Sequence, residues 1–258
     1  ERISKTYDMK LNRSKCIAII LNQKYKGQQT IKFLNGEEVP NKDSAKYLGG
    51  NVNNKGDVHQ EVSSRIATAL VAAKKLREIW NNTNTSRKWK ARVYSAVILT
   101  QLTYGLETAP PTQADNQRLD TFYYRGIRAI LGVKHSYWSR VSNAELLNRL
   151  NEGLEEGKPK YITVSQRLRN NRVKLFAHYV RALTRDDFIA ELTFDQDVNR
   201  QRIPRKRRVG KPRVKWYTQA LEDTIQFLID KGIRPDILEF DQLQQKFIIA
   251  QLAVERKL

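Results

Sequence analysis

The spacing of the apolar residues changes near Asp57, and this change determines the kind of fold that the chain can adopt. Before it, short apolar runs are separated by turn-forming residues, a pattern typical of small β-structure. After it, apolar residues recur every three or four positions, which places them on one face of an α-helix. The sequence therefore predicts a small β-rich part followed by a larger helical part.

Residues 1–55 are expected to form the β-rich part. The apolar run Cys16–Leu21 predicts a buried strand. The alternating residues Thr30–Leu34 are expected to pair with that strand across a turn at Lys26-Gly27. A second turn, a third strand and its end are predicted at Asn35-Gly36, Ala45–Leu48 and Gly49-Gly50.

The helical part has recognisable start and stop signals. Asp57 is a candidate N-cap, and Ser142 with Glu145 has the spacing of a capping box. Gly105 and Gly132 are placed to end helices, because glycine readily adopts the left-handed conformation of a helix C-cap. Helices are predicted over 57–80, over 86–104, between Pro111 and Gly132, from Ser142, and over 161–183, 217–230 and 239–256.

The segment from Arg200 to Trp216, called the basic strap below, carries nine cations and no acidic residue. Two prolines and a glycine interrupt any regular helix within it. Because like charges repel one another, the basic strap alone is expected to be an extended, solvated chain. Its cations are Arg200, Arg202, Arg205, Lys206, Arg207, Arg208, Lys211, Arg213 and Lys215.

The overall charge predicts a polyanionic partner. The chain has 47 Lys and Arg against 27 Asp and Glu, a formal net charge of +20. Such an excess on a folded chain favours RNA, DNA or an anionic membrane surface. The sequence has no run of 18 apolar residues and no marked basic amphipathic helix, so a membrane partner is not expected.

Cysteine and histidine are too sparse for a disulfide or a metal site. Cys16 is the only cysteine, which excludes an internal disulfide and fits a reducing, intracellular compartment. The histidines His59, His135 and His178 have no partner at metal-ligand spacing, and no cofactor is expected. Because the chain begins at Glu1 without Met, we expect a processed product or a fragment of a longer polypeptide.

A series of short motifs follows one another along nearly the whole chain. They are Leu11-Asn12-x-x-Lys15, Lys46–Gly49, Arg65-Ile66-x-x-Ala69, Lys90-x-x-x-Tyr94, Leu102–Gly105-x-Glu107, Arg118–Asp120-x-Phe122-x-x-Arg125, Arg128-x-Ile130–Gly132, Arg140–Asn143-x-Glu145-Leu146, Arg167–Arg169 with Ala177–Arg181, and Arg208-x-Gly210–Arg213-x-x-Trp216. In this order they resemble the C-terminal part of a non-LTR (LINE-type) retrotransposon reverse transcriptase. Ala109 and Ala177 depart from the family, which has Trp near the first position and often Gly at the second.

The resemblance implies a mainly α fold in three parts. Residues 1–55 would be the β-rich end of a polymerase palm, and residues 56–151 a thumb-like helical bundle. Residues 152–258 would be post-thumb helices that carry the basic strap, 200–216.

The resemblance also implies that the polymerase chemistry is absent from this chain. The family holds two Mg²⁺ ions with palm carboxylates that precede the motif at Leu11, and no such box occurs here. The pair Asp186-Asp187 lacks the hairpin context and is expected to cap a helix. Lys15 matches a lysine that protonates pyrophosphate in the family, but without a metal-bound nucleotide we expect only an exposed lysine.

Binding of nucleic acid is the property that the resemblance leaves to this chain. The family's thumb lays helices along the backbone of a nucleic-acid duplex, and such contacts depend on shape and charge. Tyr137 and Trp138 are candidates for stacking on unpaired bases, whereas Tyr123 is expected in the core and Trp216 as an anchor of the basic strap. The candidate phosphate contacts, each of which could instead be a solvated helix face, are Lys74, Lys75, Arg77, Arg87, Lys88, Lys90, Arg92, Arg125 and Arg128.

Two hypotheses of different classes follow. In the first, the chain is a non-catalytic, domesticated RNA-binding subunit of a large ribonucleoprotein such as a mitochondrial ribosome, where it contacts structured ribosomal RNA and neighbouring proteins. In the second, it is the nucleic-acid-holding C-terminal part of an active reverse transcriptase that performs target-primed synthesis. A third interpretation, in which Arg205–Arg208 is only a nuclear localisation signal, places the chain in the nucleus and leaves Lys211–Arg213 and Trp216 unexplained.

Replacement of Arg205, Lys206, Arg207 and Arg208 together by Ala should weaken RNA binding equally across unrelated RNA sequences. If about six strap cations meet phosphates in the unchanged chain, the logarithm of its binding constant should fall with the logarithm of salt at a slope of about −4 to −5. The substituted chain should show a shallower slope in salt titrations. A loss confined to one RNA sequence, or no loss, would contradict phosphate contact.

Overall fold

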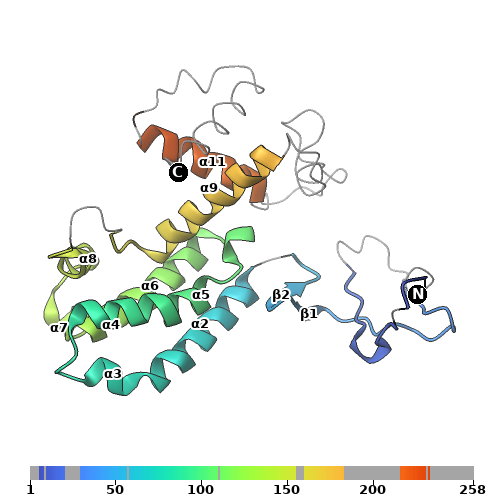
Figure 1. The fold of residues 1–258 in the computed structure, drawn as a ribbon, viewed down its shortest axis with the longest axis horizontal. Coiled ribbons are helices and arrows are strands. Elements are labelled where there is room, and N and C mark those ends of the chain that lie inside the picture. The colour runs from blue at the N-terminus through green and yellow to red at the C-terminus, as the bar shows by residue number, and fades with distance from the viewer. Residues whose placement is uncertain are drawn as a thin grey trace. The chain divides into compact units, whose positions relative to one another are not determined.

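A computed structural model describes residues 6–8, 10–20, 30–56, 58–109, 111–154, 160–182, 216–230 and 232 (Figure 1). The chain divides into two compact units, Glu1–Ser63 and Ser64–Leu258, called the N-terminal unit and the helical unit below. Over the described residues the fold is mainly helical with a small two-stranded antiparallel sheet. This confirms the predicted class of fold.

The sheet of the N-terminal unit is a hairpin of β1 (Ser44–Tyr47) and β2 (Gly50–Asn53). Ser44 lies opposite Asn53, and Tyr47 lies opposite Gly50. Leu48 and Gly49 form the turn with φ angles of 47° and 84°, the conformation that matches the twist of hairpin strands. The predicted third strand is therefore present, but Gly50 begins a partner strand that the sequence pattern did not predict.

The predicted pairing of Cys16–Leu21 with Thr30–Leu34 is wrong for the described residues. A 3₁₀ turn, η1 (Arg13–Lys15), leads into a single bridge in which Ala18 pairs with Asn41. Lys32 pairs with Glu38 across the predicted turn at Asn35-Gly36. Pairing is non-local, so an apolar run alone could not select its partner. The turn candidate Lys26-Gly27 lies outside the described residues.

The first predicted helix is broken. It consists of α2 (His59–Lys75), which begins in the N-terminal unit, and α3 (Arg77–Asn81). Leu76 leaves the helical conformation with a ψ of 16°, and the Trp80 indole donates a hydrogen bond of 2.9 Å back to the Ala73 carbonyl. This hydrogen bond fixes the bend. The sequence did not reveal the bend, because the helical spacing of apolar residues continues as far as Trp80.

The second predicted helix runs over the expected residues. It comprises α4 (Arg87–Val93), the π-helical segment η2 (Tyr94–Leu99) and α5 (Thr100–Thr103). Ser86 caps its start by accepting a hydrogen bond from the Trp89 amide. At its end Gly105 has a φ of 73°, and the 3₁₀ turn η3 (Leu106–Thr108) follows. The predicted Gly105 stop is confirmed.

Apart from the one-turn helix α7, the remaining described helices also follow their sequence signals. In α6 (Gln113–Leu131) a capping box of Thr112 and Asp115 opens the helix, and Gly132 ends it with a φ of 68°. Ser142 caps α8 (Asn143–Asn151), as predicted. The other elements are α7 (Ser136–Ser139), α9 (Val164–Ala182) and α11 (Trp216–Asp230). The predicted helix 239–256 lies outside the described residues.

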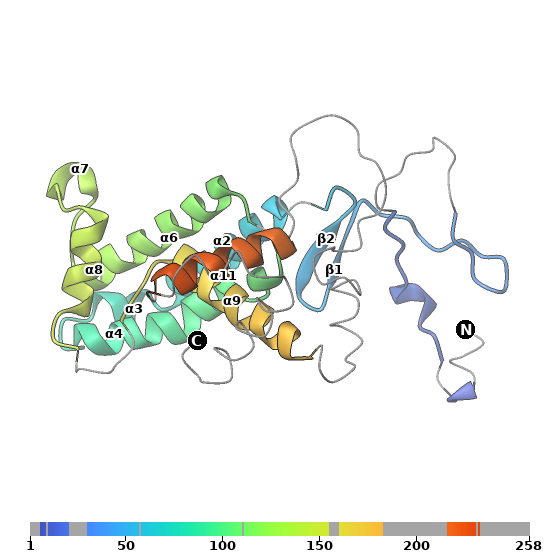
Figure 2. The same ribbon diagram turned by 90° about the horizontal axis from the view of Figure 1, so that it is seen from above.

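The core of the helical unit forms around α6. This helix packs against α3, α4, α8 and α9, and α9 packs in turn against α11 (Figures 1 and 2). Its buried face includes Leu119, Tyr123 and Ile127, and the predicted core position of Tyr123 is confirmed at 1% exposure. The ring of Tyr123 lies 6.1 Å from that of Tyr94, and burial raises the pKa of both hydroxyls.

Gly126 is the point where α6 comes closest to η2. A methyl group at this position would overlap the hydroxyl end of the buried Tyr94 side chain. The Tyr94 hydroxyl also has no hydrogen-bond partner among the described residues. The space that it occupies is open because residue 126 has no Cβ.

Gly126→Ala should lower the free energy of unfolding by about 1–2 kcal/mol, because overpacking outweighs the gain in helix propensity. Tyr94→Phe removes the nearest atom and should restore part of this loss in the double variant. Thr121→Ala, on the exposed side of α6, is the control and should stay within about 0.5 kcal/mol in urea denaturation. Independent, additive effects of the Gly126 and Tyr94 changes would contradict the contact.

Candidate nucleic-acid interface

The C-terminal end of the basic strap is anchored in the helical unit. Trp216 begins α11, and its indole donates a hydrogen bond of 2.7 Å to the Glu107 carbonyl in η3. Its ring lies 5.7 Å from the ring of Tyr179 and 6.4 Å from that of Phe176 on α9. The nine strap cations named above lie outside the described residues, as does Asp186-Asp187.

Two arginines of α9 are neutralised by α11. Arg172 is 3% exposed, and its guanidinium lies 2.8 Å from the Asp223 carboxylate. Arg169 lies 3.4 Å from Asp230. A buried pair of this kind holds the two helices together, because separating it would leave an uncompensated charge in the interior. Both guanidinium groups therefore serve the packing of α11 on α9.

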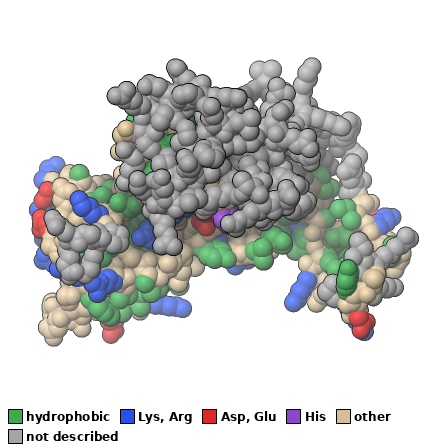
Figure 3. Space-filling view, turned by 45° about the horizontal axis from the view of Figure 1, so that its top comes forward, with side chains coloured by type: hydrophobic (Ala, Val, Ile, Leu, Met, Phe, Trp, Pro, Cys, Tyr) green, Lys and Arg blue, Asp and Glu red, His purple; other side chains and the backbone are tan. Residues whose placement is uncertain are grey.

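Six cations of the predicted set are exposed on helices. Lys74 and Lys75 end α2, and Arg77 begins α3. Over the described residues these side chains form no ion pair or hydrogen bond with another residue, and the same holds for Arg87, Arg92 and Arg125. Figure 3 shows Lys and Arg side chains projecting from the visible surface among apolar and uncharged polar ones. These six charges remain available for an external anion.

The other lysines of the predicted set have internal partners. Lys90 is 7% exposed, and its ammonium donates a hydrogen bond of 2.7 Å to the Trp80 carbonyl at the end of α3. This is a favourable place for a cation, because the carbonyls at a helix C-terminus carry partial negative charge. Lys88 is exposed but donates to the Gly153 carbonyl at 2.7 Å. Because Lys90 is buried as well as bonded, it is removed from the candidate interface, whereas the exposed Lys88 stays in it.

Arg128 is also removed from the candidate phosphate contacts, because it is 8% exposed and bonded within the protein. From the last turn of α6 it donates to the Lys134 carbonyl at 3.1 Å and to the Ser139 hydroxyl at 3.2 Å. It also donates to the Val141 carbonyl at 2.7 Å. One planar guanidinium thus gathers three acceptors from residues 134–141, a segment called the aromatic knob below.

The aromatic knob presents Tyr137 and Trp138 on the surface, where they are 65% and 74% exposed. No helix was predicted between Gly132 and Ser142, but the two residues lie on the one-turn helix α7. The His135 side chain caps this turn by accepting from the Tyr137 amide at 3.3 Å. Arg140 ends it with a φ of 56° and places its guanidinium 5.6 Å from the centre of the Tyr137 ring.

Two cations of the aromatic knob were not among the predicted contacts. Lys134 and Arg140 are exposed and flank the aromatic pair. No acidic residue occurs from Gly132 to Ala144. This local absence of acid beside Tyr-Trp was visible in the sequence and is the signal that could have identified both.

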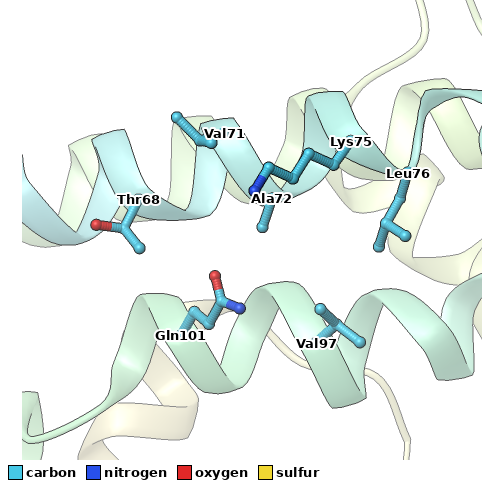
Figure 4. A pocket seen from close by; sticks show the side chains of 7 residues that line it. All are labelled: Thr68, Val71, Ala72, Lys75, Leu76, Val97 and Gln101. Atoms are coloured by element: carbon cyan, nitrogen blue, oxygen red, sulfur yellow. The ribbon is translucent and has the colours of Figure 1, made fainter.

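A shallow apolar groove separates α2 from the η2–α5 helix (Figure 4). It has a volume of about 450 Å³ and includes Val71 and Val97, with Lys75 as the cation among its lining residues.

Among the described residues no cluster of three or more His, Cys, Asp or Glu is placed to hold a metal ion. Lys15 is exposed in η1. No described helix is long and apolar enough to cross a bilayer.

Comparison with known proteins gives no match: no family model, no curated protein and no solved structure is significantly similar to this chain.

Arg128→Met should loosen the aromatic knob, because three oxygen acceptors lose their common donor. We expect the free energy of unfolding to fall by about 1.5–3 kcal/mol, the usual range for hydrogen bonds to a charged group. Amide hydrogen exchange over residues 133–141 should accelerate more than exchange in α9. Arg128→Lys keeps the charge but not the planar fork and should restore only part of the protection. Unchanged exchange in this segment would contradict the role of Arg128.

Proposed function

We propose that this chain is a non-catalytic RNA-binding protein derived from a retroelement reverse transcriptase and that it serves as a structural subunit of a large ribonucleoprotein. The observation that carries the proposal is the set of six exposed cations on α2, α3, α4 and α6 that lack partners among the described residues. They belong to a chain whose net charge is +20. An excess of exposed positive charge favours a polyanion as the partner.

Structured RNA is the polyanion that fits best. Helix-borne cations can follow a phosphate backbone, and such contacts depend on shape rather than on base sequence. The aromatic knob adds exposed rings, which bind unpaired bases but have no use on an uninterrupted duplex. A mitochondrial ribosome would offer both kinds of RNA surface together with neighbouring proteins, and the single cysteine is compatible with a reducing compartment.

The retroelement origin is supported by the order of the motifs and by one contact between two of them. Trp216 closes the basic tail motif, and its indole bonds to the carbonyl of Glu107 in the thumb-like motif. Gly105 in that motif and Gly132 in the next have left-handed backbones that glycine adopts most readily. In this proposal residues 1–55 are the end of a palm, residues 56–151 a thumb, and residues 152–258 the post-thumb region.

The N-terminal unit favours a second candidate function, in which the chain is the C-terminal part of an active reverse transcriptase. Many of its apolar side chains are exposed, and exposed apolar patches mark surfaces that bind other protein. In a polymerase, the rest of the palm would cover them. These side chains are Tyr7, Leu11, Ile17, Ile31, Leu34, Tyr47, Leu48 and Val52.

Replacement of Lys74, Lys75 and Arg77 by Gln should weaken RNA binding and make its salt dependence shallower by about 2 to 3 slope units, because each phosphate contact contributes about 0.7–0.9. Arg149→Gln is the matched control, since its guanidinium already pairs with Glu145 at 2.9 Å. The measurement is RNA affinity over a range of salt concentrations. If Arg149→Gln lowers the RNA affinity as much as each of the three other changes does on average, a specific role for the three cations is contradicted.

The two candidate functions differ in the nucleic acid that is bound and in activity. Crosslinking in cells followed by sequencing of the bound nucleic acid should return structural RNA such as ribosomal RNA under the first. Recovery of element RNA and target DNA, together with primer extension by a protein that includes any residues encoded upstream of Glu1, would establish the second and reject the first.

A further inference from the structure

We propose that the Trp138 ring is a stacking platform for one unpaired nucleobase of RNA, and that the hydrogen bonds of the aromatic knob hold the turn that carries this ring. The inference rests on the proposed function, namely that the chain binds RNA. It goes further by assigning one residue to unpaired bases, as distinct from the helix-borne cations that would follow phosphates.

The geometry of the aromatic pair selects Trp138. The rings of Tyr137 and Trp138 meet edge to face, with their centres 5.0 Å apart and their planes at 89°. Whichever ring supplies the edge, at least one face of the indole is left uncovered by Tyr137. Tyr137 also has the guanidinium of Arg140 over its ring at 5.6 Å. The indole is therefore the surface on which a base can stack, and Tyr137 is its support.

The charge around the knob favours a nucleotide as the ligand. Lys134 and Arg140 lie on either side of the two aromatic residues in the sequence, and residues 132–144 contain no acid. A base on Trp138 would thus place its phosphates within a locally cationic segment. Stacking tolerates any base because every base has a π-face, so little sequence preference is expected.

The knob is rigid enough for this role. Arg128 fixes its two ends through the Lys134 and Val141 carbonyls, and the His135 cap fixes the turn that carries Tyr137. A ring that is 74% exposed would otherwise lose conformational freedom on binding a base. Because the backbone of the turn is already held, less freedom is lost when a base binds, and this gives a buried arginine a role beneath a surface turn.

The test measures the affinity of the protein for three RNAs. Two are single-stranded oligouridylates of equal length and charge, one intact and one with abasic sites, and the third is an RNA duplex. Wild-type protein should bind the intact strand about 5- to 150-fold more tightly than the abasic strand, the range for one stacked base. Trp138→Ala should abolish this preference while leaving duplex affinity and the salt slope unchanged. Trp138→Phe should retain most of the preference.

Trp89→Ala is the matched control, because Trp89 is 47% exposed beside Arg87 and Lys88 but lies outside the knob. It should leave the preference for the intact strand unchanged. Thermal unfolding of each variant shows whether the fold is intact. Because the replaced rings are exposed, the midpoint of unfolding should change little.

The outcomes separate the two proposals. If wild-type protein binds RNA but Trp138→Ala retains the preference for intact strands, the stacking platform is rejected and the proposed function stands. If wild-type protein binds none of the RNAs, the proposed function fails. If Trp138→Ala loses binding only to anionic phospholipid vesicles and keeps its RNA preference, the knob contacts membranes and the platform is likewise rejected.

Discussion

Burial of one face of α6 is the constraint on which the helical unit depends. Leu119, Tyr123 and Ile127 are buried along this face, and four other helices pack against α6. The same helix supplies Asp120, whose carboxylate accepts hydrogen bonds from the amide and hydroxyl of Ser165 at the start of α9. It also supplies Arg128, which holds the aromatic knob. The core helix thus positions both α9 and the turn that carries the exposed rings.

The cations of this basic chain serve two different purposes. Lys90, Arg128 and Arg172 are buried, and each has hydrogen-bond acceptors or a carboxylate within the protein. Those partners offset part of the cost of removing the charges from water. Lys74 and Arg77 are exposed and have none among the described residues. The net charge of the chain counts buried and exposed cations alike. It therefore overstates the charge that an external partner can meet, and residue type alone does not tell which cations are buried.

The two parts of the proposed interface act through different physics. Helix-borne cations attract phosphates over distances comparable to the Debye length, so their effect falls with salt. In the proposal, the exposed indole of Trp138 acts only in contact and depends on an unpaired base. Together they favour an RNA that combines helices with single-stranded loops, which is the character of a large structured RNA rather than of a simple duplex.

The sequence by itself determined the features that depend on neighbours along the chain. Helix ends at Gly105, Gly132 and Ser142 were predictable, because capping uses residues within one turn. The tertiary structure alone decided the pairing of Ala18 with Asn41, the bend at Leu76, and the internal use of Lys90 and Arg128. Each of these depends on a partner that lies close only after the chain has folded. The sequence could name Trp138 as a candidate, but only the fold could show that a buried arginine from α6 holds its turn on the surface.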